Sequence, residues 1–299
     1  MGERMRWADG FIAVDWGTTN RRAYLIAPSG ECVDEFEDGN GILSVPAGGF
    51  EAAVNEIRQR LGDKPLLLAG MVGSNRGWLE APYVACPAGL DDLVRGLAWA
   101  GEREAIVPGV SYIGQGRADV MRGEEVQLLG AVAAGTIPAD GLVCHPGTHN
   151  KWAELADGKL VGFRTVMTGE LFNLLKAHSI LAELLQPDVE PDEAFRAGVN
   201  HGLGHDDVPS ELFAVRARYL LDQAPKEKAA SYASGLLIGA DVRIGLGESR
   251  PSQVVVMGRP ELTELYAAAL TEAGVSSLEL DGERCFLAGI ARIAERIGQ

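Results

Sequence analysis

The sequence FIAVDWGTTNRRAYLI occupies residues 11–26. Its first four residues read as a buried strand, the run DWGTTN as a turn, and residues 22–26 as a second strand. The sequence GLVCHPGTHNKWAEL at residues 141–155 repeats this pattern, because GTTNRRAYL at 17–25 aligns with GTHNKWAEL at 147–155 without a gap. The chain therefore carries one strand–turn–strand unit twice.

A Gly-Thr turn between two strands exposes backbone N–H groups and a hydroxyl, and both suit phosphate oxygens. Two such turns facing each other across a cleft would hold a polyphosphate from both sides. The alternative is a coincidental pair of hairpins, since short matches are easily found in a chain with 38 glycines. The organisation resembles that of the actin, hexokinase and Hsp70 ATPase superfamily. That resemblance implies two duplicated actin-like (ribonuclease H-like) α/β domains with a nucleotide cleft between them.

Strand and helix patterns alternate along the rest of the chain, which is typical of an α/β protein. We expect the first domain at residues 1–135 and the second at 136–299. Further strands are predicted at 66–69, 253–257 and 276–280. Helices are predicted at 50–61, 124–134, 169–185, 191–200, 211–222, 227–245, 260–273 and 283–297.

Composition limits the class of partner. The net charge of −15 on 299 residues makes nucleic acid and anionic membranes unfavourable partners. No stretch is apolar enough over a sufficient length to span a bilayer, and no signal peptide is visible, so we expect a cytoplasmic protein. The cysteines Cys32, Cys86, Cys144 and Cys285 form no C-x-x-C pair and are expected to be buried thiols. The oligomeric state is open, with a homodimer as one candidate.

Longer stretches resemble one family, the 2-dehydro-3-deoxygalactonokinases. They cover the chain nearly end to end, and their combination is more specific than any single one. They are residues 14–20 (VDWGTTN), 70–74 (GMVGS), 77–83 (GWLEAPY), 119–130 (DVMRGEEVQLLG), 145–152 (HPGTHNKW), 167–172 (MTGELF) and 234–240 (SGLLIGA).

This resemblance implies an ATP-dependent kinase that phosphorylates the terminal hydroxyl of 2-dehydro-3-deoxygalactonate, a small-molecule sugar acid. It also implies Mg²⁺ as the metal. Two alternatives stay open: a phosphatase or ATPase of the same fold, and a kinase for another 2-keto-3-deoxy sugar acid. A sugar-sensing regulator is a further class, although such relatives usually carry an added DNA-binding segment.

The resemblance also implies roles for the two turns. Asp15 closes the first strand and is the predicted Mg²⁺ ligand through water, since Mg²⁺ takes few carboxylates; the alternative is an Asp that caps its own turn. A strand–Gly–helix element at residues 253–273 is predicted to contact adenosine. The predicted nucleotide-binding residues are Gly17, Thr18, Thr19, Gly147, Thr148, His149 and Gly258.

A carboxylate held near the attacking hydroxyl is required as the catalytic base. Sugar kinases of this superfamily place it at the start of a helix, and the sequence GEEV at residues 123–126 lies at such a place. The order of preference is Glu124, then Asp119, then Glu125. The alternative is that Glu in a first helical turn only interacts with the helix dipole.

The substrate carboxylate favours an arginine, which can bind it in a bidentate manner. Each candidate arginine has the alternative of being a solvated surface charge. The predicted substrate-binding residues are Asn20, Ser74, Asn75, Arg76, Arg122 and Arg164. Thr168 is a predicted N-cap of the helix that follows it, and Gly235 and Gly239 are expected to allow close packing, as in an interdomain contact.

Overall fold

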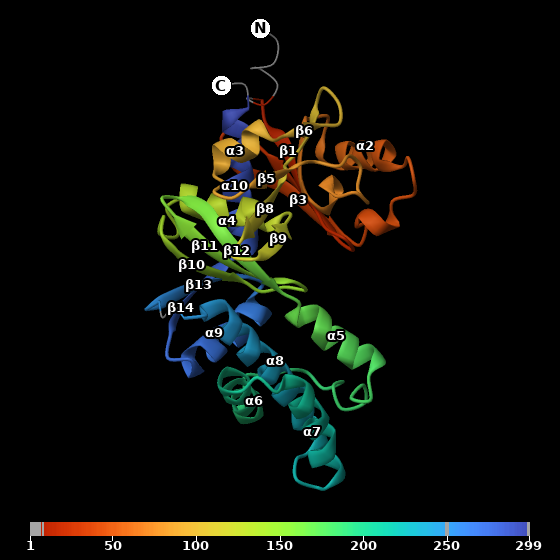
Figure 1. The fold of residues 1–299 in the computed structure, drawn as a ribbon. Helices are drawn as coiled ribbons and strands as arrows, with labels where there is room; N and C mark the ends of the chain where they lie inside the picture. The colour runs from red at the N-terminus through yellow and green to blue at the C-terminus, as the bar shows by residue number, and fades with distance from the viewer. Residues whose placement is uncertain (1–6, 8, 249–250, 298–299) are drawn as a thin grey trace. The chain divides into compact units, whose positions relative to one another are not determined.

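The computed structural model describes residue 7 and residues 9–248 and 251–297 (Figure 1). β1 (Phe11–Trp16) and β4 (Leu66–Gly70) are parallel neighbours at the centre of a six-stranded sheet. Nearly all their residues are buried, and a strand covered on both faces has an uninterrupted apolar sequence. The other strands are β2 (Arg21–Ile26), β3 (Cys32–Asp38), β6 (Ala98–Trp99) and β7 (Glu104–Ile106), and the order is β3-β2-β1-β4-β7-β6.

The chain divides into two units by its internal contacts. Unit 1 consists of Met1–Asp140, Leu155–Gly162 and Glu283–Gln299, and unit 2 of Gly141–Glu154 and Phe163–Gly282. The predicted ranges differ from these units, because three segments of the second predicted range, residues 136–140, 155–162 and 283–299, group with unit 1.

Unit 1 also contains a small sheet and several helices. The small sheet has the order β5-β8-β9 with β5 (Tyr83–Ala85), β8 (Gly109–Gly114) and β9 (Arg117–Met121). The helices are α2 (Phe50–Leu61), α3 (Leu90–Arg95), α4 (Glu124–Ala133) and α10 (Gly282–Arg296), with 3-10 turns η1 (Ile42–Ser44) and η2 (Met71–Gly73). The predicted C-cap of α2 is confirmed, since Gly62 has a φ of 101° and its N–H donates to the carbonyl of Arg58.

A second sheet has the order β12-β11-β10-β13-β14. Its strands are β10 (Gly141–His145), β11 (Asn150–Ala156), β12 (Lys159–Val166), β13 (Gln253–Gly258) and β14 (Ser276–Asp281). β10 pairs in parallel with β13, and β13 with β14. In both sheets the strand before the Gly-Thr turn therefore lies between its hairpin partner and a parallel strand.

The helices of unit 2 are α5 (Thr168–His178), α6 (Glu193–Gly204), α7 (Val208–Leu220), α8 (Ala229–Leu246) and α9 (Pro260–Glu272), with the 3-10 turn η3 (Lys226–Lys228). The predicted helix at 169–185 is wrong beyond His178. Ser179 is extended and its hydroxyl donates to the carbonyl of Leu175, which ends the helix. Leu181 and Leu185 are still buried, so the apolar pattern continues without a helix.

α6 and α8 cross in backbone contact. A Cβ added to Gly239 would lie 2.3 Å from the carbonyl oxygen of Val199, and one added to Gly235 would lie 2.1 Å from that of Phe195. The predicted close packing at these glycines is confirmed. The prediction of an interdomain contact is wrong, because the partner helix α6 lies in the same unit.

Gly239→Ala is expected to lower the free energy of unfolding by about 1–3 kcal/mol, because the added methyl group must displace the backbone of α6. Gly204→Ala, at the end of α6, is the matched control. A Cβ there meets nothing within 4 Å, so we expect an unchanged or slightly higher stability. Chemical denaturation measures both, and equal stabilities of the two variants would contradict the backbone contact.

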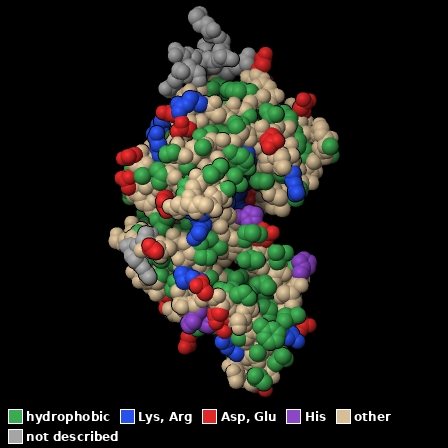
Figure 2. All heavy atoms as spheres, in the orientation of Figure 1, with side chains coloured by type: hydrophobic (Ala, Val, Ile, Leu, Met, Phe, Trp, Pro, Cys, Tyr) green, Lys and Arg blue, Asp and Glu red, His purple; other side chains and the backbone are tan. Residues whose placement is uncertain are grey.

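The surface of unit 2 exposes apolar side chains on α5, on α7 and on the segments that follow these helices. They are Leu171, Leu174, Ile180, Phe213, Tyr219, Leu220 and Leu221. Figure 2 shows hydrophobic surface where Figure 1 draws these helices. Apolar patches are a feature of interaction surfaces, and the homodimer stays a prediction.

Two of the four cysteines follow the prediction. Cys144 and Cys285 are buried, whereas Cys86 is half-buried and Cys32 is exposed. The prediction for Cys32 is wrong because β3 is an edge strand with little buried surface. Among the helices of the described residues, none combines the length and the apolar character needed to cross a membrane.

Candidate active site

The first Gly-Thr turn joins β1 to β2 and has a fixed shape. The N–H of Gly17 donates to the carbonyl of Asn20 at 2.9 Å. The backbone of residues 41–43 donates to the carbonyls of Gly17, Thr18 and Thr19 at 3.0–3.3 Å. The side chains of Thr18 and Thr19 are exposed. The turn thus presents two hydroxyls from a rigid loop, as a phosphate-binding turn requires.

Asp15, Gly70 and Gly123 meet beside this turn at the ends of β1 and β4. A Cβ on Gly70 would lie 3.3 Å from Oδ1 of Asp15 and 2.9 Å from the carbonyl of Trp16. A Cβ on Gly123 would lie 3.3 Å from Cα of Gly70. Both glycines have positive φ, 90° and 111°, a conformation that glycine adopts without strain. Glycine here lets the start of α4 approach the end of β4, beside Asp15 of β1.

The three predicted carboxylates lie in one segment but differ in access. Glu124 is half-buried, and its Oε2 accepts a bond from the N–H of Arg122 at 3.1 Å. Glu125 is fully buried; its Oε2 accepts from the N–H of Gly123 at 2.7 Å, and its Oε1 has no hydrogen-bond partner among the described residues. Burial, with a smaller effect of the neighbouring Glu124 charge, raises the pKa of Glu125 to about 8. Asp119 lies half-buried on β9 and accepts a bond from the next backbone N–H.

A carboxyl group with a pKa of about 8 is protonated at neutral pH and is a poor proton acceptor there. Glu125 is therefore less suited to act as the base than its neighbour. Glu124 combines partial access with a position at the first residue of α4, which favours it.

Of the residues of unit 1 predicted to bind the sugar acid, Ser74 closes a turn of the backbone. Ser74 is buried; its hydroxyl donates to the carbonyl of Met71 at 2.7 Å and accepts from the N–H of Arg76. Asn75, Arg76 and Asn20 are exposed. Ser74 thus shapes the loop, and the exposed side chains beside it can reach a ligand.

Arg122 is buried under the loop that follows η2. Its Nη2 donates to the carbonyl of Ala81 at 2.8 Å, and its guanidinium lies 4.4 Å from the ring centre of Tyr83. A Cβ on Gly73 would lie 2.8 Å from Nη1. Nε and Nη1 have no hydrogen-bond partner in the described part of the chain. Arg164, by contrast, is exposed and lies on β12 in unit 2.

The second Gly-Thr turn lies against the start of α5. The carbonyl of Thr148 accepts from the N–H of Glu170 at 2.9 Å, and a Cβ on Gly169 would lie 2.4 Å from the carbonyl of Gly147. His149 Nε2 hydrogen-bonds with Oε2 of Glu170 at 2.5 Å. The turn and the first residues of α5 therefore form one rigid corner.

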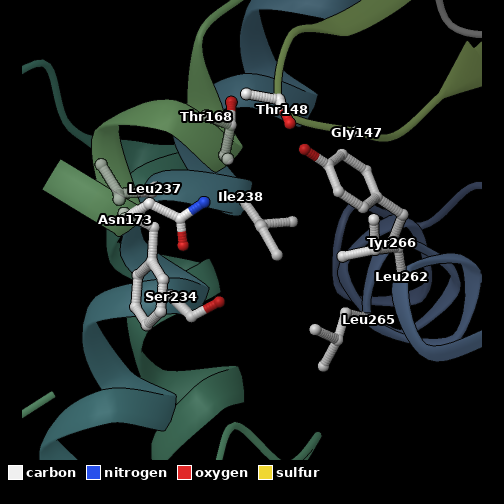
Figure 3. Close-up of a pocket in the computed structure, with 12 residues that line it drawn as sticks. Gly147, Thr148, Thr168, Asn173, Ser234, Leu237, Ile238, Leu262, Leu265 and Tyr266 are labelled. Atoms are coloured by element: carbon white, nitrogen blue, oxygen red, sulfur yellow. The ribbon is translucent and has the colours of Figure 1, made fainter. Parts of the chain in front are cut away.

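A cavity of about 220 Å³ opens beside this corner in unit 2 (Figure 3). Its wall combines apolar side chains of α8 and α9 with a few hydroxyl and amide groups, as small-molecule sites do. Gly258 is not among its lining residues. It lies next to Pro146, since a Cβ added to Gly258 would lie 3.5 Å from the carbonyl oxygen of Pro146. The lining residues are Gly147, Thr148, Thr168, Gly169, Phe172, Asn173, Ser234, Leu237, Ile238, Leu262, Leu265 and Tyr266.

Thr168 has a different role from the predicted one. The N-cap of α5 is Met167, and Thr168 is the first helical residue. Its hydroxyl donates to Oδ2 of Asp241 at 2.5 Å, so it is bonded to a buried carboxylate rather than to the helix end. Asp241 and Tyr266 are not among the residues predicted from the sequence. A single carboxylate within the apolar sequence GLLIGADV of α8 was the available signal, because buried Asp is rare unless it is paired.

Solved structures with low sequence identity show the fold alone. Component A of (R)-2-hydroxyglutaryl-CoA dehydratase from Acidaminococcus fermentans is 10% identical, with a TM-score of 0.55 over 97% of this chain and 99% of its own. The activator of 2-hydroxyisocaproyl-CoA dehydratase from Clostridium difficile, with bound ADPNP, is 12% identical with a TM-score of 0.50 over 96% and 95%. The protein has the mixed α/β fold of the actin-like ATPases.

The family model for 2-keto-3-deoxy-galactonokinase matches residues 15–293. The 2-dehydro-3-deoxygalactonokinase of Escherichia coli K12 is 35% identical over 96% of this chain and 98% of its own. The crystal structure of a Sinorhizobium meliloti protein assigned to the same activity has 33% identity and a TM-score of 0.91 over 96% and 99%. The chain belongs to the 2-keto-3-deoxy-galactonokinase family, so the resemblance predicted from the sequence is confirmed and the protein is a phosphotransferase.

Proposed function

We propose that this chain transfers the γ-phosphoryl group of ATP to the terminal hydroxyl of 2-dehydro-3-deoxy-D-galactonate, which gives the 6-phosphate. The observation that carries the proposal is the family match over residues 15–293. The two exposed Gly-Thr turns supply hydrogen-bond donors for the phosphate oxygens, and the carboxylate at the start of α4 supplies a base. Phosphoryl transfer needs both kinds of group.

The two halves of the chain are proposed to be duplicated actin-like domains, with functional ranges 1–135 and 136–299. The repeated sequence at 17–25 and 147–155 supports this, as does the matching strand order β3-β2-β1-β4-β7 and β12-β11-β10-β13-β14. The first sheet has the additional edge strand β6. The first domain would bind the sugar acid and the second the adenosine. A nucleotide cleft, the cytoplasmic location and a homodimer remain predictions.

Glu124 is the proposed base, ahead of Asp119 and Glu125. It accepts the proton of the terminal hydroxyl while that oxygen attacks the γ-phosphorus. The bond from this phosphorus to the β,γ-bridging oxygen breaks, and ADP leaves. The protein contributes mainly position and charge, because this reaction needs little covalent help.

The phosphate contacts are proposed from both turns: Gly17, Thr18 and Thr19 in unit 1, and Gly147, Thr148 and His149 in unit 2. The apolar wall of the 220 Å³ cavity suits the adenine base and its polar groups suit the ribose. Gly258 lies outside the lining of this cavity, and its contact with the nucleotide stays a prediction.

Arg122 is the preferred ligand of the substrate carboxylate, because two buried nitrogens of its guanidinium group, Nε and Nη1, lack hydrogen-bond partners among the described residues. Arg76 is the next candidate, since it is exposed beside Asn75 in the same loop. Arg164 and Asn20 are proposed at the periphery of the sugar acid.

Asp15 would hold Mg²⁺, which stabilises the charge on the transferring phosphoryl group. Its half-buried carboxylate, at the strand end beside Gly70, fits a metal bound through water. No group of three or more His, Cys, Asp or Glu side chains is arranged to hold a metal ion in the described residues. Phosphate oxygens and water would complete the coordination.

A coupled kinase assay across a panel of 2-keto-3-deoxy sugar acids tests the proposal. We expect the highest kcat/KM with the galactonate-derived acid and very low ATP hydrolysis without a sugar acid. A preference for the gluconate-derived epimer would favour the kinase for another acid. Rapid hydrolysis without any acid would favour the phosphatase or ATPase.

Asp15→Asn is expected to raise the Mg²⁺ concentration for half-maximal activity by about tenfold or more, as removal of a metal-supporting carboxylate does elsewhere. Titration of activity with Mg²⁺ at saturating ATP and sugar acid measures this shift. Asp63→Asn, an exposed surface change in the same unit, is the control and should leave the titration unchanged. An unaltered Mg²⁺ requirement in Asp15→Asn would remove the metal role.

A further inference from the structure

Asp241 of α8 is a fully buried carboxylate that accepts four side-chain hydrogen bonds. Its Oδ2 accepts from Nδ2 of Asn150 at 2.8 Å, from Oγ1 of Thr168 at 2.5 Å and from the hydroxyl of Tyr266 at 2.5 Å. Its Oδ1 accepts from Nε1 of Trp152 at 2.8 Å. Both oxygens therefore have partners, and the partners come from three elements besides α8.

These elements form the cavity of unit 2 and the turn beside it. Asn150 is the first residue of β11, directly after the Gly-Thr turn, and Thr168 is the first residue of α5, which backs that turn. Thr168 and Tyr266 line the cavity, and Figure 3 shows their oxygen atoms near Thr148 and Gly147. Asp241 itself does not line the cavity, so it acts on a ligand only through its partners.

Burying a carboxylate is unfavourable, and burial raises the pKa of Asp241 in spite of the four donors. Well-packed apolar residues would stabilise such a core at least as well as a buried charge. Unlike apolar residues, a buried carboxylate requires each hydrogen-bond donor to point at one of its oxygens. The four hydrogen bonds to Asp241 therefore set the relative positions of the turn, the start of α5 and the cavity wall.

We propose that Asp241 is a positioning residue for the nucleotide, which holds the turn at residues 147–149 and the first turn of α5 in the geometry that binds phosphate. The inference rests on the proposed function in taking ATP as the ligand. It goes beyond that proposal, because it gives a role to a residue that touches neither substrate.

Asp241→Asn tests this role, since it keeps the size of the side chain and turns one acceptor oxygen into a donor that faces other donors. We expect the Kd of ATP, measured by calorimetry without sugar acid, to rise by about tenfold or more, which corresponds to about 1.4 kcal/mol. The KM of the sugar acid should change by less than about twofold, because its proposed ligands lie mainly in unit 1. A wild-type Kd for ATP in this variant would overturn the proposal, whatever the change in thermal stability.

Thr168 offers a matched pair of variants that applies even if Asp241→Asn does not fold. Thr168→Ser keeps the hydroxyl that donates to Asp241, whereas Thr168→Val keeps the volume and loses it. We expect Ser to retain ATP affinity and Val to lose it. Thr263→Val is the control: this buried threonine donates to Glu279 instead, so its loss should lower stability and leave the Kd unchanged. Equal Kd values for the Ser and Val variants would contradict the role of the hydrogen bond.

Hydrogen exchange supplies a measurement that needs no nucleotide. In Asp241→Asn, or in Thr168→Val, the amides of residues 147–150 should exchange faster, while those of residues 17–20 in unit 1 keep their rates. Unchanged exchange at 147–150 would overturn the proposal. A wild-type protein that binds ATP but phosphorylates no sugar acid would instead contradict the proposed function and leave this inference intact.

Discussion

Gly147→Val is expected to weaken ATP binding by about a hundredfold or more, which corresponds to about 2.8 kcal/mol, while the protein still folds. A Cβ on Gly147 meets no atom within 4 Å, so the fold accepts the side chain. The branched side chain would instead occupy the space through which a phosphate approaches the backbone. Calorimetry with ATP and a thermal melt together measure the two effects.

Gly17→Val makes the same test in unit 1, where a Cβ would lie 3.3 Å from the carbonyl of Asn20 and needs only a small adjustment. Gly204→Val, on α6, adds equal bulk where nothing lies within 4 Å, and it should leave ATP affinity unchanged. If both turn variants bound ATP normally, the proposal that the two turns bind phosphate would be wrong.

The parts of the fold that the sequence predicted are those with buried, uninterrupted apolar strands. β1, β4, β10 and β13 lie inside their sheets, and their apolar runs end at turns rich in glycine. The repeated Gly-Thr turn identified which strands correspond. These signals are local, so a single sequence contains them.

The parts that the sequence did not predict depend on contacts between distant residues. β3 is an edge strand whose residues are mostly exposed, so it has no apolar alternation to detect. The helix predicted to reach residue 185 ends at His178, although leucines beyond it are buried. These leucines are buried without being helical, and hydrophobic spacing in the sequence indicates only the burial.

The candidate site shows the same division. Glu124, Glu125 and Arg122 were predicted from one motif, but the fold gives them different environments. Glu124 is half-buried, Glu125 is fully buried, and Arg122 is hydrogen-bonded to the carbonyl of Ala81 in a loop. Burial distinguishes the two neighbouring glutamates, which follow directly on the approach of Gly123 to Gly70. No spacing in the sequence encodes that approach.

Glu124→Gln is expected to lower kcat by about a hundredfold or more, since general-base catalysis contributes about 10²–10⁴-fold. Glutamine keeps the size of the side chain and can still accept a bond from the N–H of Arg122, but it cannot accept the proton. The Kd values of ATP and sugar acid should change much less, because the loss belongs to the transition state. Steady-state kinetics at saturating substrates, with binding measured separately, give both quantities.

Glu125→Gln is the matched control one residue along the helix. Because the pKa of Glu125 is raised to about 8, the carboxyl is already neutral at pH 7 and glutamine replaces it with little change of charge, so kcat should fall only slightly. The assignment would be reversed if Glu125→Gln lost turnover and Glu124→Gln kept it. If both variants were active, Asp119→Asn would be the next test, and activity in that variant as well would place the base outside residues 119–125.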